Sequence, residues 1–230
     1  MDPQHFISLD RALTEATAQL RDGLSKVWEI RRGGGLPPNG LQTLSLGLEL
    51  LMKVVLSLHA SNTDGRFLTP KELKRQYGHS LEKSFNAIHE SFASTPVVGV
   101  DLDLLSDDLV STRLLNILTD FGEGGRFHAF DSLTSTLSDS PNEQWSELEI
   151  DILGSHPREA NLLGTDRWSE AFEVVSRELL VRIERLARVL SRLFTLGHLG
   201  ADGKRLSPHV LRFSGVMDRD LGTKDYGTTP

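Results

Sequence analysis

The feature that most constrains this chain is an apolar stretch from Leu41 to Leu58, LQTLSLGLELLMKVVLSL, in which Glu49 and Lys53 are the only charged residues. A helix that is apolar on nearly every side must be covered on nearly every side. Two charges near its middle, with polar neighbours such as Gln42 and Thr43, would be costly in hydrocarbon, so we expect no membrane span. The stretch therefore predicts the central helix of an all-α bundle.

Apolar residues that recur at three- and four-residue spacing predict further helices around this one. We expect them over residues 4–31, 39–60, 70–77, 79–92, 107–121, 142–152 and 165–196. A strand is expected only over Pro96–Leu105, where Val98, Val100 and Leu102 alternate with small or polar residues. The sequence thus predicts an up-and-down bundle of about five or six main helices over residues 1–200, followed by a mobile C-terminal extension over 201–230.

Composition excludes several function classes. The formal net charge of −7 argues against attraction of nucleic acid to the whole surface, so any such site must be a local basic patch. Cysteine is absent, which excludes disulfides and thiolate metal sites. No helical zinc motif, phosphate loop or hydrolase elbow is present, so we expect no metal or cofactor. No stretch resembles a signal peptide, so we expect a cytoplasmic protein.

Three places could carry a binding site. Glu49 and Lys53 lie four residues apart in the favourable order, so they either form a simple ion pair or line a polar site. His79 lies at a break between helical segments, where its ring could hold a backbone carbonyl or reach a neighbouring helix. Arg126 follows a glycine-rich loop and is either solvated beside two aromatic anchors or part of a binding site.

The long final helix carries a stripe of arginines. Favourable i,i+4 spacing pairs some of them with acids: Glu173–Arg177, Glu178–Arg182 and Glu184–Arg188. Arg185 and Arg192 have no acid four residues away, so they are expected to be available to a phosphate or a partner. The alternative is that the whole stripe is an ordinary solvated face.

One pairing of motifs resembles a known family. The run Leu48-Glu49-Leu50-Leu51-Met52-Lys53, followed after a loop by Gly78-His79-Ser80-Leu81, resembles the HEPN superfamily over roughly residues 40–92. Its members often carry Leu-Glu-x-x-x-Lys on one helix and Gly-His-Asp-Leu at the next. Here Ser80 stands where the family has Asp.

The resemblance implies an all-α bundle, often dimeric, associated with RNA or nucleotides in stress-response, toxin–antitoxin or phage-defence systems. Some members are metal-independent ribonucleases that use an Arg and a His separated by a short spacer, and Arg192 and His198 match this with five residues between them. Such a pair would cleave RNA through its own 2′-hydroxyl, with His198 as general acid or base and Arg192 stabilising the phosphate charge. Leu193 follows the Arg, where the family usually has a polar residue.

Two functions stay open at this point. The first is a HEPN-like protein that associates with RNA or a nucleotide, with ribonuclease activity among its expected properties and a homodimer as its expected form. The second is a non-catalytic helical module that binds an antitoxin or another protein. The net charge favours the second, whereas arginines without local acids favour the first.

Overall fold

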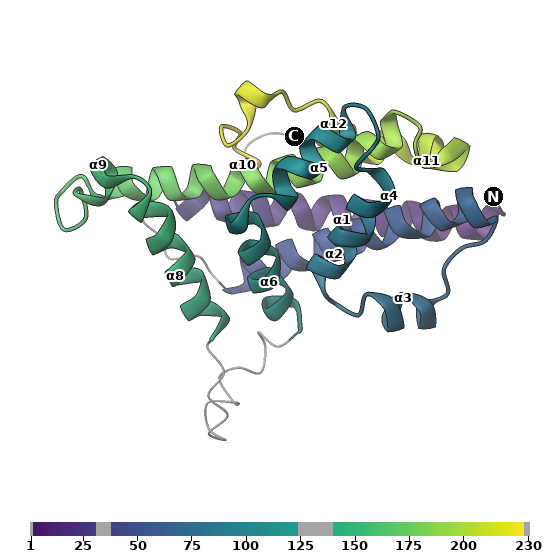
Figure 1. The fold of residues 1–230 in the computed structure, drawn as a ribbon, viewed down its shortest axis with the longest axis horizontal. Coiled ribbons are helices and arrows are strands. Elements are labelled where there is room, and N and C mark those ends of the chain that lie inside the picture. Colours follow the sequence, from purple (N-terminus) through teal and green to yellow (C-terminus); the bar gives the residue numbers. More distant parts are fainter. Residues whose placement is uncertain (1, 31–37, 124–139, 228–230) are drawn as a thin grey trace, which may run out of the picture.

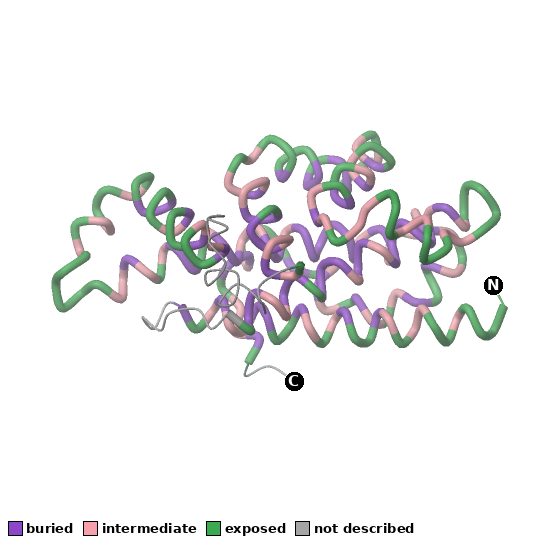
Figure 2. Tube along the Cα trace, turned by 90° about the horizontal axis from the view of Figure 1, so that it is seen from below, coloured by how far each residue is buried: buried purple, intermediate pink, exposed green. Residues whose placement is uncertain are grey.

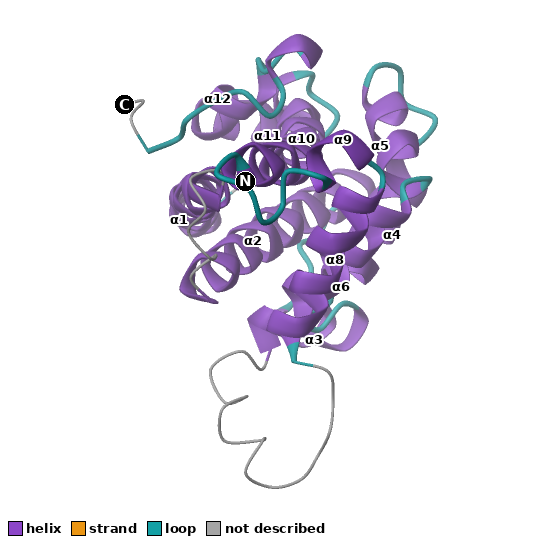
Figure 3. Cartoon of the chain, turned by 90° about the vertical axis from the view of Figure 1, so that its left-hand side faces the viewer, coloured by secondary structure: helices purple, strands orange, loops and turns teal. Residues whose placement is uncertain are grey.

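A computed structural model describes residues 2–30, 38–123 and 140–227 of the chain. Within these ranges every regular element is a helix, which confirms the all-α prediction (Figure 3). In chain order the elements are α1 (Pro3–Glu29), α2 (Pro38–Asp64), α3 (Pro70–Gln76), α4 (Leu81–Phe92), α5 (Val98–Ser106), α6 (Leu109–Glu123), α8 (Pro141–Gly154), α9 (Pro157–Ala160), α10 (Trp168–Thr195), α11 (Gly200–Leu206), η3 (Ser207–Val210), α12 (Leu211–Ser214) and η4 (Asp218–Asp220).

Helix α2 is the buried helix that the apolar stretch predicts. Leu44, Leu48, Leu51 and Val55 have no exposed surface, and α1, α4, α6 and α10 all pack against this helix. Its length and composition alone would suit a membrane span, and 72% of the most apolar window is buried inside the fold. Figure 2 shows how burial concentrates on the inward-facing sides of the helices.

Helices α1 and α2 approach each other closely because glycines lie at their contact. A Cβ atom on Gly23 would lie 2.6 Å from Cβ of Leu44, and one on Gly47 would lie 2.8 Å from the backbone nitrogen of Leu20. Real Cβ atoms do not come this close to their neighbours, so a side chain at either position would push the two helices apart.

Helix α10 is the longest element and spans the molecule beside α1 (Figure 1). It contacts α1, α5, α8 and α12 along its length. Leu179, Leu190 and Phe194 are fully buried, so the face opposite the arginines is part of the core. The predicted helix over residues 165–196 therefore agrees with the observed element to within a few residues.

The strand expected over Pro96–Leu105 is wrong, because this segment forms α5. Val98, Leu102 and Leu105 are its buried apolar side chains, and their four- and three-residue spacing fits a helix. Val98 and Leu102 also fit an alternating pattern, so the short run could not distinguish the two structures. The N-cap residue Val97 has a φ of 70°, a region that β-branched residues rarely adopt.

Residues after 200 pack on the bundle, in contrast to the mobile extension expected from the sequence. Leu206, Val210, Phe213 and Tyr226 belong to the same hydrophobic core as α1 and α10. The core thus continues across residue 200, because apolar residues recur among the glycines and acids of this segment.

The helix ends follow local sequence signals. Thr69 caps α3 in a reciprocal capping box with Glu72. Helix α8 begins at Pro141, one residue before the expected range, and Ser140 and Glu143 form its capping box. Helix α6 begins at Leu109, and the side chain of Asp108 accepts hydrogen bonds from the backbone nitrogens of Val110 and Ser111.

Candidate functional site

Three of the sequence-predicted residues meet in one cluster, which we call the Glu49 cluster: Glu49, Lys53 and His79. Lys53 donates a hydrogen bond to Oε1 of Glu49 within α2, and Nδ1 of His79 lies 3.0 Å from the same oxygen. Glu49 is nearly buried, with 10% of its side chain exposed, whereas the His79 side chain is 56% exposed. The carboxylate thus holds two nitrogen donors at the edge of the core.

The break between α3 and α4 positions His79 for this contact. Gly78 has a φ of 57°, a backbone conformation that favours glycine. This residue turns the chain after α3, and Ser80 then caps the start of α4. A carboxylate only accepts hydrogen bonds, so Nδ1 of His79 is the donor and Nε2 faces no described hydrogen-bond partner. Nε2 is therefore the ring atom available to a ligand.

A second cluster forms around Asp101 of α5, which accepts hydrogen bonds from arginines of α10. Nη2 of Arg188 lies 2.6 Å from Oδ1 of Asp101 and Nη1 of Arg192 lies 3.2 Å from Oδ2, while Nε of Arg185 lies 3.9 Å from Oδ1. Arg188 and Asp101 are both buried, and Arg188 also pairs with Asp218 at 2.8 Å. We call these five residues the Asp101 cluster.

This cluster corrects the expectation that Arg185 and Arg192 have no acidic partner. Both arginines lie against Asp101. Asp101 is far from them in the sequence, so the i,i+4 spacing within one helix could not predict these pairs. Burial lowers the pKa of Arg188, but the hydrogen bonds to Asp101 and Asp218 outweigh it and raise that pKa above its ordinary value. The same contact lowers the pKa of Asp218.

The expected i,i+4 pairs on α10 have different outcomes. Glu178 and Arg182 form the predicted ion pair at 2.6 Å, and Arg182 also reaches Asp108 at 2.6 Å. Glu184 instead accepts a hydrogen bond from the backbone nitrogen of Gly222 at 2.6 Å. This hydrogen bond holds the C-terminal segment against α10. Burial raises the pKa of Glu184 above its ordinary value.

Arg192 lies in the last turn of α10, and His198 lies just beyond its end. Gly197 and His198 form a Schellman motif at the end of α10, with the His198 nitrogen donating to the Leu193 carbonyl at 3.0 Å. The Arg192 side chain turns to Asp101 and to the carbonyl of Ser214. Within the described parts of the chain, no hydrogen bond or ion pair joins the Arg192 and His198 side chains.

Arg126, the remaining predicted binding residue, lies outside the described residues.

Comparisons of the chain with protein-family models, curated proteins and solved structures found no match. The Glu49 cluster has the stronger claim, because it joins two segments that the sequence had singled out separately and leaves a ring nitrogen exposed.

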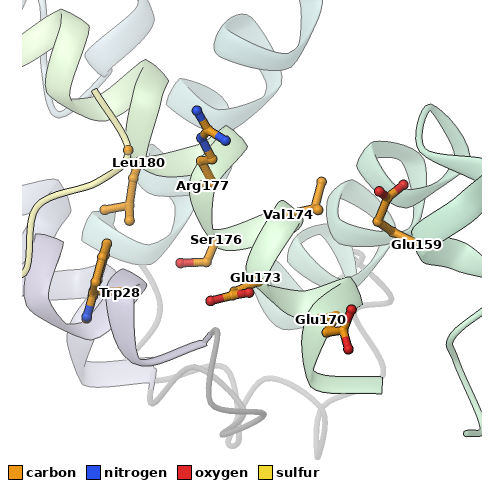
Figure 4. Close-up of a pocket in the computed structure, with 9 residues that line it drawn as sticks. Trp28, Glu159, Glu170, Glu173, Val174, Ser176, Arg177 and Leu180 are labelled. Carbon is orange, nitrogen blue, oxygen red and sulfur yellow. The ribbon is translucent and has the colours of Figure 1, made fainter. Parts of the chain in front are cut away.

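A cleft on the surface of the described residues contains none of the predicted site residues. It has a volume of about 300 Å³ and lies along the first half of α10, beside Trp28 of α1 (Figure 4). Glu159, Glu170 and Glu173 outnumber the one basic residue of the lining, Arg177, so the cleft is acidic on balance. Arg167 binds the Glu170 carboxylate through two hydrogen bonds. An acidic lining disfavours phosphate. This cleft is therefore not a candidate for the phosphate binding that we consider for the Glu49 cluster.

Asp108 allows a pH-dependent test of the contact between α6 and α10. Burial raises the pKa of Asp108, but the hydrogen bonds from Arg182 and Ser111 outweigh it, so the pKa lies below its ordinary value. We expect Asp108→Ala to lower the free energy of unfolding by about 2 kcal/mol near neutral pH, since it removes a helix cap and a charged hydrogen bond.

This effect should shrink in acid. A carboxyl group with a lowered folded-state pKa stabilises the fold above its unfolded-state pKa and loses that contribution as the pH falls through the folded-state pKa. Urea unfolding of both proteins at about pH 7 and about pH 3 measures it, with the exposed neighbour Asp107→Ala as control. An equal difference at both pH values would contradict the assignment.

Proposed function

We propose that this chain is a HEPN-like up-and-down bundle of five or six main helices around α2, and that it associates with RNA or nucleotide phosphate through the Glu49 cluster. One observation carries the proposal. The two halves of the resemblance, Glu49-x-x-x-Lys53 and Gly78-His79, meet at a single carboxylate oxygen. This shared contact supports the proposal that the two motif halves form one site.

The chemistry of the cluster suits a phosphate group. The ammonium group of Lys53 has three N–H donors, and one of them donates to Glu49. The His79 side chain is more than half exposed, and its Nε2 has no hydrogen-bond partner among the described residues. Glu49 fixes both groups while it remains nearly buried, so a phosphate would meet donors that are already ordered.

Arg192 and His198 remain the proposed cleavage pair of the ribonuclease form. In one protomer Arg192 is engaged by Asp101 and Ser214, so the pair would need a second protomer or a rearrangement at the end of α10. The proposal therefore separates two steps, in which the Glu49 cluster binds phosphate and the Arg192–His198 pair cleaves.

RNA titration tests the binding step. We expect single-stranded RNA to bind the parent at low salt, and His79→Ala or Lys53→Met to weaken the affinity about tenfold, measured by fluorescence anisotropy. Each lost phosphate contact should also reduce the slope of log affinity against log salt by about 0.7. His89→Ala is the matched control, because His89 of α4 pairs with Asp103 of α5 and has no contact with Glu49 among the described residues.

Equal affinity in the parent and both variants would contradict the binding proposal.

The cleavage step is tested by incubating total RNA with the parent, Arg192→Ala and His198→Ala in chelator. Cleavage by the parent that disappears in both variants supports the ribonuclease form, and cleavage that persists in them removes the pair.

A second candidate is a non-catalytic helical module that binds an antitoxin or another protein. It is favoured by the outer face of α5, where Val100 is 64% exposed and Val97 and Leu104 are about half exposed. Such neighbouring apolar side chains are typical of protein-binding surfaces. A parent that neither binds nor cleaves RNA in the experiments above would favour this candidate over the first.

A further inference from the structure

Helix α3 is held in place by local contacts rather than by burial in the core. None of its residues is buried, and Figures 1 and 3 show it at the edge of the bundle. A helix of 7 residues has little stability of its own. Contacts at its start fix it instead: the Thr69–Glu72 capping box, Pro70 in the first turn, and Arg66, whose nitrogens lie 2.8 Å and 3.0 Å from the Glu72 carboxylate. The fold therefore positions this helix and leaves its side chains at the surface.

One face of α3 is basic. Lys71, Lys74 and Arg75 have the i, i+3, i+4 spacing that places side chains on one side of a helix. All three are exposed, and none of their side chains forms a hydrogen bond or ion pair with a described residue. The acid of the same helix, Glu72, is bound by Arg66, whose hydrogen bonds lower the Glu72 pKa to about 2. The charge of this face is therefore not neutralised within α3.

The segment around α3 has the opposite charge to the chain as a whole. Residues 66–83 contain five arginines and lysines and two glutamates, a net charge of +3, whereas the whole chain carries −7. Asp64 and Glu82, near the two ends of the segment, offset part of this charge. A polyanion would thus be attracted to this local patch and not to the surface in general.

The Glu49 cluster directly follows α3 in the chain. Arg75 lies four residues before His79, and the chain turns between them at Gly78 so that His79 reaches Glu49. Tyr77, the C-cap residue of α3, is partly exposed, and the His79 side chain is more than half exposed. Proteins bind a single nucleic-acid strand through cations that contact its phosphates and aromatic rings that stack on its unpaired bases. Both kinds of side chain are present here.

We infer that the basic face of α3 binds the phosphates of single-stranded RNA through Lys71, Lys74 and Arg75. The inference rests on the proposed association with RNA and specifies the ligand, which is a strand of several nucleotides. A mononucleotide carries its charge at one end and would engage only part of this face. A strand can contact the three cations of α3 and the Glu49 cluster together.

Fluorescence anisotropy of the full chain with a single-stranded RNA of about ten nucleotides tests the surface. The triple variant Lys71→Gln, Lys74→Gln, Arg75→Gln should weaken binding about tenfold or more at low salt. It should also reduce the slope of log affinity against log salt by about 2, because three phosphate contacts are lost. Adenosine monophosphate, used as a competitor, should bind the parent about tenfold or more weakly than the RNA.

A second triple variant, Arg21→Gln, Arg158→Gln, Arg219→Gln, is the matched control. It removes the same charge from three exposed residues of other elements, so it should keep the affinity and the salt slope close to those of the parent. The α3 variant should unfold at the parent's temperature, because α3 has no buried residue and glutamine suits a helix about as well as lysine and arginine.

The outcomes separate this inference from the proposed function. Equal affinity and salt slope in the two triple variants would overturn the inference, and a weaker His79→Ala variant would then still support the Glu49 cluster. Weaker binding by the α3 variant with parent-like binding by His79→Ala would support the α3 surface and contradict the role of the Glu49 cluster. A parent that binds no RNA would overturn both.

Two competitors test the class of ligand. Adenosine monophosphate that binds as tightly as the RNA would overturn the assignment to a strand. Polyglutamate that displaces the labelled RNA as well as unlabelled RNA of the same charge does would overturn the assignment to RNA and indicate an acidic protein segment, since a peptide of this kind offers no base to the rings of Tyr77 and His79.

Discussion

Replacing Asp101 by Ala should lower the free energy of unfolding by about 3–5 kcal/mol, because it leaves the buried guanidinium of Arg188 with only the exposed Asp218 as a counter-ion. Only 6% of the Asp101 side chain and 2% of the Arg188 side chain are exposed. Arg188 binds the carboxylate through two nitrogens, at 2.6 Å and 3.1 Å, and Arg192 adds a third contact. Chemical denaturation near neutral pH measures the loss.

Asp103→Ala is the matched control for this change. It removes the same group from the same helix, but the Asp103 side chain is 58% exposed and pairs with His89, so the loss should stay within about 1 kcal/mol. The double variant Asp101→Ala with Arg188→Met should recover part of the stability, since it removes the unpaired charge. Equal losses for Asp101→Ala and Asp103→Ala would show that the buried pair is not important for stability.

Replacing Leu51 by Ala should lower the free energy of unfolding by about 2–5 kcal/mol. Leu51 has no exposed surface and lies in the middle of α2, which other helices surround. The substitution removes apolar contacts and leaves a cavity that helices packed on several sides can fill only in part. The midpoint of urea unfolding should fall while its slope stays unchanged.

Leu46→Ala provides the control in the same helix. The Leu46 side chain is 38% exposed, so the same chemical change should cost clearly less, about 1 kcal/mol. If the two variants lost equal stability, α2 would not be the buried helix of the bundle.

The helices could be predicted because their signals are local. A three- and four-residue apolar spacing, the Thr69–Glu72 capping box and the break at Gly78 are each contained in a few residues. The strand prediction failed over α5, where a short run fits two periods equally well. The packing of the segment after residue 200 was missed because its apolar residues are widely spaced among glycines and charges.

The candidate sites show the same limit. The contact between Glu49 and Lys53 follows from spacing within one helix, whereas the arrival of His79 at the same oxygen depends on how the chain turns before α4. Asp101 meets Arg188 across 87 residues of sequence, and no local pattern marks that pair.

The glycine contact between α1 and α2 also bears on the Glu49 cluster. Gly47 lies two residues before Glu49 in α2, and a Cβ atom on Gly47 would meet the backbone of α1. A side chain at Gly47 would push α2 away from α1 and so displace the carboxylate that holds Lys53 and His79. The position of this carboxylate therefore depends on α1, a helix that contributes no side chain to the cluster.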